Sequence, residues 1–141
     1  MTDSKEISST AGFYNNDIDK FKIANDKNEA NKQLKKLCEE LFKTEVLITN
    51  NFLNDENYYK FFQIKQVKNI LQNSDITKTV EIYFENAMNT SVASMAGYMH
   101  RNTMVYRLQK IKNTIGLDIR NFSDAVIYKN ILSCYKVMFN D

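Results

Sequence analysis

Residues 90–116 read TSVASMAGYMHRNTMVYRLQKIKNTIG, and this stretch predicts two helices joined by a tight turn. In its second half, apolar residues recur at i, i+4, i+7 and i+11, which is one stripe of an α-helix: Met104, Leu108, Ile111 and Ile115. Small and flexible residues at 92–96 predict a shorter first helix that begins within residues 89–91. Gly97 and Tyr98 then occupy the turn, where glycine can take a positive φ at little cost. The stretch therefore indicates a helix-turn-helix whose second helix packs on a core.

The solvent face of the second helix carries cations and short polar groups but no carboxylate. Between residues 86 and 117 the only formal charges are positive: Arg101, Arg107, Lys110 and Lys112. The net charge of the chain is also more positive in its second half, which contains this helix. Residues 1–75 hold 11 Lys and 12 Asp or Glu, whereas residues 76–141 hold 8 Lys or Arg and 5 Asp or Glu. A basic run without acids in such a chain favours a polyanion as partner.

A family resemblance rests on residues 100–118, HRNTMVYRLQKIKNTIGLD, and extends over residues 76–132. This segment resembles the C-terminal helix-turn-helix of PucR-type transcriptional regulators, in which a His-Arg-Asn-Thr box opens the recognition helix and Gly-Leu-Asp follows it. A weaker likeness in the same register is to the Fis nucleoid protein. Ser94 and Gly97 depart from the family pattern, where Ala and a large apolar residue are usual. The resemblance implies a bacterial DNA-binding protein with a looser contact between the two helices.

The resemblance and the basic face together predict a set of DNA-binding residues: His100, Arg101, Asn102, Thr103, Tyr106, Arg107 and Lys110. We expect Arg101 and Asn102 to reach base edges in the major groove, because Arg pairs with guanine and Asn with adenine through two hydrogen bonds. Thr103 is expected on a phosphate or a thymine methyl group, and Arg107 and Lys110 on phosphates further along the groove. His100 opens the box, so it caps the recognition helix or touches a phosphate.

Other kinds of function find little support in the sequence. There is no glycine-rich phosphate loop, no nucleophile motif and no carboxylate pair framed by a cleft, which argues against an enzyme. No His, Cys and Asp cluster has metal-ligand spacing, so neither a metal nor a cofactor is expected. Cys38 and Cys134 lie on apolar stripes, which suits reduced core residues. No apolar run is long enough to span a membrane and the start lacks a signal peptide, so we expect a cytoplasmic protein.

The absence of proline and the presence of only three glycines favour helices over sheets. We therefore predict an all-α fold, a helical bundle with a C-terminal helix-turn-helix of the Fis-like or PucR type. Residues 1–27 are predicted to be polar and partly disordered, apart from a short helix allowed by apolar residues within 13–23. Residues 28–74 are predicted to form an N-terminal helical region for dimerisation or partner binding. Residues 75–141 are predicted to form the DNA-binding domain.

Within these regions the apolar spacing locates individual helices. It predicts one helix over residues 29–42, and residues 44–52 form either a helix or an extended connector. A single aromatic helix follows a cap at Asp55 and runs through residues 58–71. The next helix is capped by Ser74 or Asp75, supports the helix-turn-helix and precedes a final helix capped by Ser123 or Asp124.

The leading functional hypothesis is a sequence-specific transcriptional regulator that binds double-stranded DNA without catalysis. The alternatives are a protein-interaction module, such as an antagonist or co-regulator, and a nucleoid-type architectural protein. One recognition helix contacts few base pairs, so a homodimer is expected. Two sets of large apolar residues are candidates for the shared surface: Tyr58, Phe61 and Phe62, or Tyr135, Met138 and Phe139.

Overall fold

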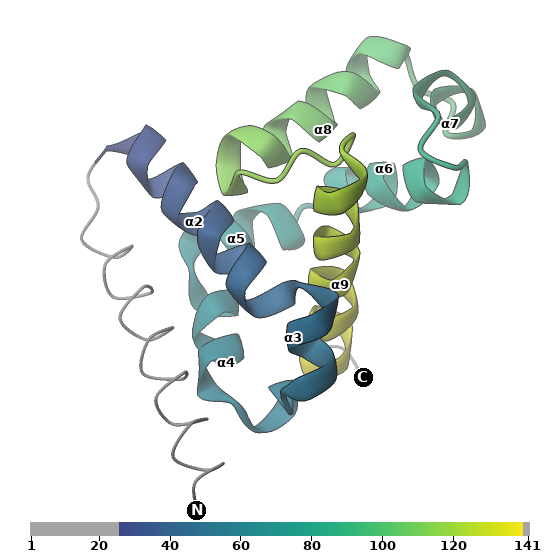
Figure 1. Ribbon diagram of the computed structural model, residues 1–141. Helices are drawn as coiled ribbons and strands as arrows, with labels where there is room; N and C mark the ends of the chain where they lie inside the picture. The colour runs from purple at the N-terminus through teal and green to yellow at the C-terminus, as the bar shows by residue number, and fades with distance from the viewer. Residues whose placement is uncertain (1–25, 140–141) are drawn as a thin grey trace, which may run out of the picture.

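Residues 26–139, which the computed structural model describes, form eight α-helices and one short 3-10 turn, with no strand in that range (Figure 1). The elements in chain order are α2 (Lys27–Phe42), α3 (Thr44–Thr49), η1 (Phe52–Asn54), α4 (Glu56–Gln63), α5 (Lys65–Leu71), α6 (Ser74–Glu85), α7 (Thr90–Ala96), α8 (Arg101–Ile115) and α9 (Phe122–Phe139). The prediction of an all-α fold is confirmed. The segment predicted to be partly disordered, with its short helix, lies outside the described residues except for Asp26 and Lys27.

Helix α2 joins the two ends of the molecule because it packs against both α8 and α9. Asp26 caps it by accepting a hydrogen bond from the backbone N–H of Asn28 at 2.8 Å. Its buried side chains are the predicted apolar stripe: Leu34, Leu37, Cys38, Leu41 and Phe42. Figure 1 shows α6, α7 and α8 at one end, α3 and α4 at the other, and α9 running between them.

An aromatic cluster centred on Phe42 fills the core at the α4 end of the molecule. The ring centroids of Tyr58, Phe61 and Phe62 lie 4.8–5.8 Å from that of Phe42, and the Tyr58 hydroxyl donates to the Leu41 carbonyl at 2.8 Å. All three α4 side chains are at most 2% exposed. The first candidate dimer surface is therefore wrong, because the end of α2 covers these rings within the same chain.

The predicted single helix over residues 58–71 is in fact two helices. Ile64 adopts an extended conformation, with φ −64° and ψ 130°, and separates α4 from α5. The apolar residues of this segment cover too wide an arc for one straight helix to bury them all against the core. The break lets Phe61 and Phe62 face α2 and α9, while Val67, Ile70 and Leu71 are buried elsewhere. For the connector before it, the helical alternative is confirmed by α3.

Asparagine side chains, rather than the predicted residues, cap two of the later helices. Asn73 Oδ1 accepts from the backbone N–H of Ile76 at 3.1 Å, so Ser74 already lies inside α6. Asn121 Oδ1 accepts from the backbone N–H of Asp124 at 3.2 Å at the start of α9. Both bonds span three residues, which is the N-cap geometry that Asn favours as strongly as Ser or Asp. The cap predicted at Asp55 is confirmed by its 2.8 Å bond from the Asn57 N–H.

Both cysteines are free and buried, as expected for reduced core residues. Burial raises the pKa of the Cys134 thiol to about 11 and raises the pKa of Cys38 further above its ordinary value. The thiolate is the reactive form of cysteine, so both side chains are held in the inert thiol form at neutral pH. None of the described helices is long and apolar enough to cross a membrane.

Candidate functional site

Helices α6, α7 and α8 pack against one another and form a three-helix unit at one end of the molecule (Figure 1). Asn89 starts α7 by accepting from the backbone N–H of Val92 at 3.0 Å. Ala93 and Ser94 are buried between the helices, and the Ser94 hydroxyl donates to the Ser91 carbonyl at 3.0 Å. The serine that departs from the family pattern thus has its hydroxyl hydrogen-bonded within its own helix. The prediction that the helix before the motif supports it is confirmed.

The turn between α7 and α8 differs from the prediction in which residue takes the left-handed conformation. Gly97 has φ −91°, whereas Tyr98 has φ 52°. The Met99 N–H bonds the Ser94 carbonyl at 3.0 Å and the Tyr98 N–H bonds the Met95 carbonyl at 3.1 Å, which is the Schellman pattern of a helix end. That pattern places the left-handed residue one position after Gly97. The glycine serves close packing instead, since a Cβ there would lie 3.1 Å from both Ile82 Cδ1 and Met99 Cε.

Helix α8 begins with the residues predicted to reach DNA bases. His100 is the cap, in an extended conformation, and its Nδ1 accepts from the backbone N–H of Asn102 at 3.1 Å. The capping role given to His100 is therefore confirmed, and in the neutral ring the proton is on Nε2. Arg101 and Asn102 are exposed on the first turn. The N-terminal end of a helix also carries the positive end of the helix dipole, which favours anions.

The exposed face of α8 is set by its buried stripe. Met104, Leu108, Ile111 and Ile115 are buried as predicted. Asn102, Tyr106 and Lys110 follow one another at i, i+4 and i+8 on the opposite side, and all three are exposed. Tyr106 is 66% exposed. Thr103 is half-buried beside this face. Five of the seven predicted residues are thus exposed: 100–102 at the start of α8, and Tyr106 and Lys110 along this face.

Arg107 lies at the edge of that surface rather than on it. The residue is half-buried, and Nη1 donates to Thr79 Oγ1 of α6 at 3.1 Å. Among the described residues, Arg101, Arg107 and Lys110 have no carboxylate within ion-pair distance. Lys112, the fourth cation of the basic run, differs because its Nζ lies 3.7 Å from Asp118 Oδ2. Three uncompensated positive charges therefore remain along α8.

A polar network holds the C-terminal end of α8 in place, and the sequence did not predict it. Arg120 bonds Asp118 Oδ1 at 3.1 Å through Nε and Gln109 Oε1 at 2.7 Å through Nη2. Gln109 in turn donates to Asn113 Oδ1 at 3.0 Å. Burial works to raise the pKa of Asp118, but the hydrogen bonds and charge of Arg120 and the charge of Lys112 hold that pKa below its ordinary value. Gln109 and Arg120 are 11 positions apart, one in α8 and the other in the loop after it, so no helical spacing indicates the network.

Exposed apolar side chains that the sequence analysis did not single out lie in the helix and the turn that precede α8. Met95 of α7 is mostly exposed, and Tyr98 in the turn is 98% exposed. Tyr98 also takes a left-handed conformation that costs a non-glycine residue about 1–2 kcal/mol. No group of three or more His, Cys, Asp or Glu in residues 26–139 could hold a metal ion.

A short supporting helix, a second short helix and a longer helix with an exposed basic face together define a helix-turn-helix domain. Residues 76–129, from α6 into α9, match the family model of the PucR C-terminal helix-turn-helix domain. This part of the chain is therefore a PucR-type helix-turn-helix domain, and the predicted resemblance is confirmed. No solved structure shows significant similarity to the chain.

Three curated bacterial proteins show distant similarity to the chain. The carbohydrate diacid regulator of Escherichia coli is 31% identical over 64 residues, 45% of this chain and 17% of that protein. The proline-responsive transcriptional activator PutR of Bacillus subtilis is 32% identical over 73 residues, 52% of this chain and 17% of that protein. The uncharacterized protein YxkF of B. subtilis is 30% identical over 54 residues, 38% of this chain and 18% of that protein. The chain thus matches less than a fifth of the length of each relative.

Proposed function

We propose that this chain is a sequence-specific DNA-binding transcriptional regulator of the bacterial cytoplasm that reads the major groove with α8 and catalyses no reaction. The observation that carries the proposal is the open face of α8, which holds uncompensated cations and no carboxylate within a PucR-type domain. Two of the similar proteins are, by name, a regulator and a transcriptional activator. DNA is a polyanion, so such a face gains from displacing its counterions.

The placement of the side chains supports distinct roles along the helix. Arg101 and Asn102 occupy the first turn, where recognition helices usually contact base edges. Tyr106 and Lys110 follow one and two turns later, at the positions that meet the groove wall and its phosphates. The 15 residues of α8 span about 22 Å, longer than the width of about 12 Å of the major groove that receives such a helix. His100 fixes the start of α8 through its cap and leaves Nε2 for a phosphate.

We expect the protein to bind duplex DNA with an affinity that falls steeply as salt rises. Three to five neutralised phosphates per subunit give a log–log slope of about −3 to −4.5 per subunit, or about 10²-fold weaker binding for a fourfold rise in salt. Fluorescence anisotropy with mixed genomic fragments at several salt concentrations measures this slope. Lys43→Ala removes an exposed cation just before α3, a helix at the opposite end of the molecule from α8 (Figure 1), and should leave the slope unchanged.

The exposed side chains of Met95 and Tyr98 favour a second candidate, a protein-interaction module, because apolar surface at one end of a domain is typical of a protein interface. A nucleoid-type architectural role is the third candidate. The same titrations separate the three. Absent or salt-independent binding supports the protein-interaction module. Salt-dependent binding that random DNA competes away completely supports the architectural role, whereas a fraction that resists random competitor supports the regulator.

We further infer that two copies pair through the C-terminal end of α9 and the adjoining edge of α4, so that the N-terminal helical region contributes to the dimer. Tyr135, Met138 and Phe139 are only partly covered there, and the Phe139 ring lies 5.2 Å from Tyr135 and 6.0 Å from Tyr59 by centroid. Val137 beside them is 60% exposed. A second copy would cover this apolar surface and place two recognition helices on one DNA site.

The dimer predicts a particle of twice the 16.5 kDa chain mass in light scattering at micromolar concentration. Val137→Asp should yield a folded monomer with DNA binding weakened by about tenfold or more, because a charge cannot be buried at an apolar interface without a large cost. Ile48→Asp, on the exposed side of α3, is the matched control and should stay dimeric. A 16.5 kDa particle with and without DNA would contradict the dimer.

A further inference from the structure

Arg107 is held by a chain of hydrogen bonds that leads from α8 into the backbone of α6. Its Nη1 donates to Thr79 Oγ1 at 3.1 Å, and that hydroxyl donates to the Asp75 carbonyl at 2.7 Å. Thr79 is 0% exposed. A hydroxyl has one proton, and in Thr79 this proton is committed to the carbonyl four residues back. The oxygen can therefore only accept from Arg107, so the direction of the chain is fixed.

The partner of Arg107 is unusual because it is neutral. A guanidinium that merely joins two helices is served best by a carboxylate, which gains both charge and hydrogen bonds. Thr79 orients Arg107 without cancelling its charge. The guanidinium also has five N–H groups, so the bond to Thr79 leaves donors for a second acceptor. The Arg107 guanidinium can therefore bind an anion from outside the chain.

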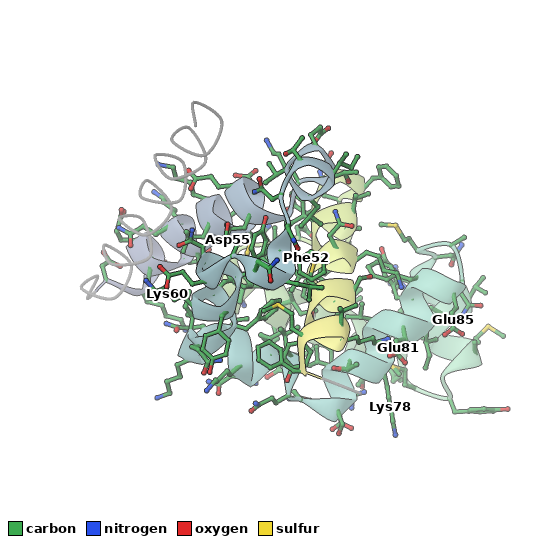
Figure 2. The ribbon with its side chains drawn as sticks, turned by 90° about the horizontal axis from the view of Figure 1, so that it is seen from below. Phe52, Asp55, Lys60, Lys78, Glu81 and Glu85 are labelled. Carbon is green, nitrogen blue, oxygen red and sulfur yellow. The ribbon has the colours of Figure 1, made fainter. Side chains whose placement is uncertain are left out.

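The acidic residues of α6 leave this charge uncompensated. Glu81 follows Thr79 by two residues, which places it on the opposite side of the helix, where it pairs with Lys136 at 3.9 Å. Figure 2 shows Glu81 and Glu85 along α6 together with Lys78. Asp75 contributes its backbone carbonyl, rather than its carboxylate, to the chain from Arg107.

We propose that Thr79 is a positioning residue that presents the Arg107 guanidinium to a DNA phosphate at the junction of α6 and α8. The inference rests on the proposed DNA-binding function and extends the interface from α8 to the supporting helix. Thr79 itself is buried and touches no DNA. Its effect is to order a long side chain before binding, so that this ordering does not have to occur in the complex.

A double-mutant cycle on the full chain tests the inference. Thr79→Val keeps the shape of the side chain and removes the hydroxyl, and it should weaken DNA binding about three- to tenfold, the cost of ordering one long side chain. Arg107→Ala should weaken binding to all sequences and reduce the magnitude of the salt slope by about one. In the Arg107→Ala background, Thr79→Val should have no further effect on affinity. Thr79→Ser retains the hydroxyl and should bind like the unmodified protein.

Thr77→Val on the same helix is the matched control and should not change affinity. Thermal unfolding shows whether each variant keeps its fold, and Thr79→Ala replaces Thr79→Val if valine is not tolerated. Equal weakening by Thr79→Val in both backgrounds would overturn the inference, because Thr79 would then act independently of Arg107. Weakening by Arg107→Ala with no effect of Thr79→Val would also overturn it, while leaving the proposed function intact. Loss of salt-dependent binding in the unmodified protein would instead reject the proposed function.

Discussion

Gly116→Ala is expected to lower the free energy of unfolding by about 2–4 kcal/mol. Gly116 ends α8 with φ 86°, a conformation that costs an L-residue about 1–2 kcal/mol. A Cβ at this position would also lie 2.7 Å from Lys35 Cβ and 2.9 Å from the Asn31 backbone carbonyl of α2. Neither neighbour is the far end of a flexible side chain, so relief requires that α2 and the end of α8 move apart.

That movement would disturb the contact that fixes α8 on the rest of the molecule. Asn31 Nδ2 donates to the backbone carbonyls of both Lys112 and Asn113 at 3.1 Å. A side chain from α2, about 80 residues earlier in the chain, thus supplies hydrogen-bond donors to carbonyls in the last turn of α8, where a helix leaves its carbonyls without partners of its own. The variant should therefore be destabilised twice, by the loss of these hydrogen bonds and by the backbone strain at residue 116. Urea denaturation followed by circular dichroism measures the change through the midpoint.

Gly97→Ala is the control because it also adds one methyl group to a glycine at a helix end of the same domain. Gly97 has φ −91°, and its nearest neighbours are the ends of the Ile82 and Met99 side chains, which can shift by a few tenths of an ångström. We expect a change of no more than about 1 kcal/mol in either direction. Equal losses at the two glycines would show that the left-handed backbone and the approach of α2 do not set the cost.

The sequence predicted those parts of the fold that depend on local spacing. The helices α2 and α8 follow from apolar residues repeated along one face, and that pattern requires no knowledge of what covers the face. The aromatic residues Phe61 and Phe62 show the limit of this information. Their spacing indicates an apolar surface but not whether its partner is Phe42 of the same chain or a second copy. The break at Ile64 could not be predicted for the same reason, because it depends on which parts of the chain cover the residues before and after it.

The candidate site could be located from the sequence, whereas its supporting contacts could not. The box that begins at His100 and the absence of acids from α8 are local features of the chain. Arg107 and Thr79 are 28 residues apart, and threonine inside a helix has no spacing signal that indicates its partner. The left-handed backbone conformation of Tyr98 was not predicted, because glycine is the residue expected to adopt it. Gly97 beside it instead allows close packing against Ile82 and Met99.

Arg101→Ala and Asn102→Ala are each expected to reduce discrimination between a preferred DNA site and random DNA by about 1–3 kcal/mol, or about 5- to 150-fold. Both residues are exposed on the first turn of α8. The Arg101 guanidinium forms no ion pair within the described residues. Removing a side chain that forms two hydrogen bonds to one base costs binding only where that base is present. Random DNA should therefore lose little affinity beyond the charge contribution of Arg101.

Lys110→Ala supplies the contrast from two turns further along the same helix. Lys110 is exposed, and an ammonium group on a phosphate carries no base information, so this variant should weaken binding to all sequences alike and reduce the magnitude of the salt slope by about one. A selected site has first to be enriched from a random duplex library with the unmodified protein. Each variant is then titrated against that site and against random duplex at one salt concentration. If all three variants weakened the selected and the random duplex equally, Arg101 and Asn102 would be phosphate contacts, and base recognition would have to lie elsewhere on the domain.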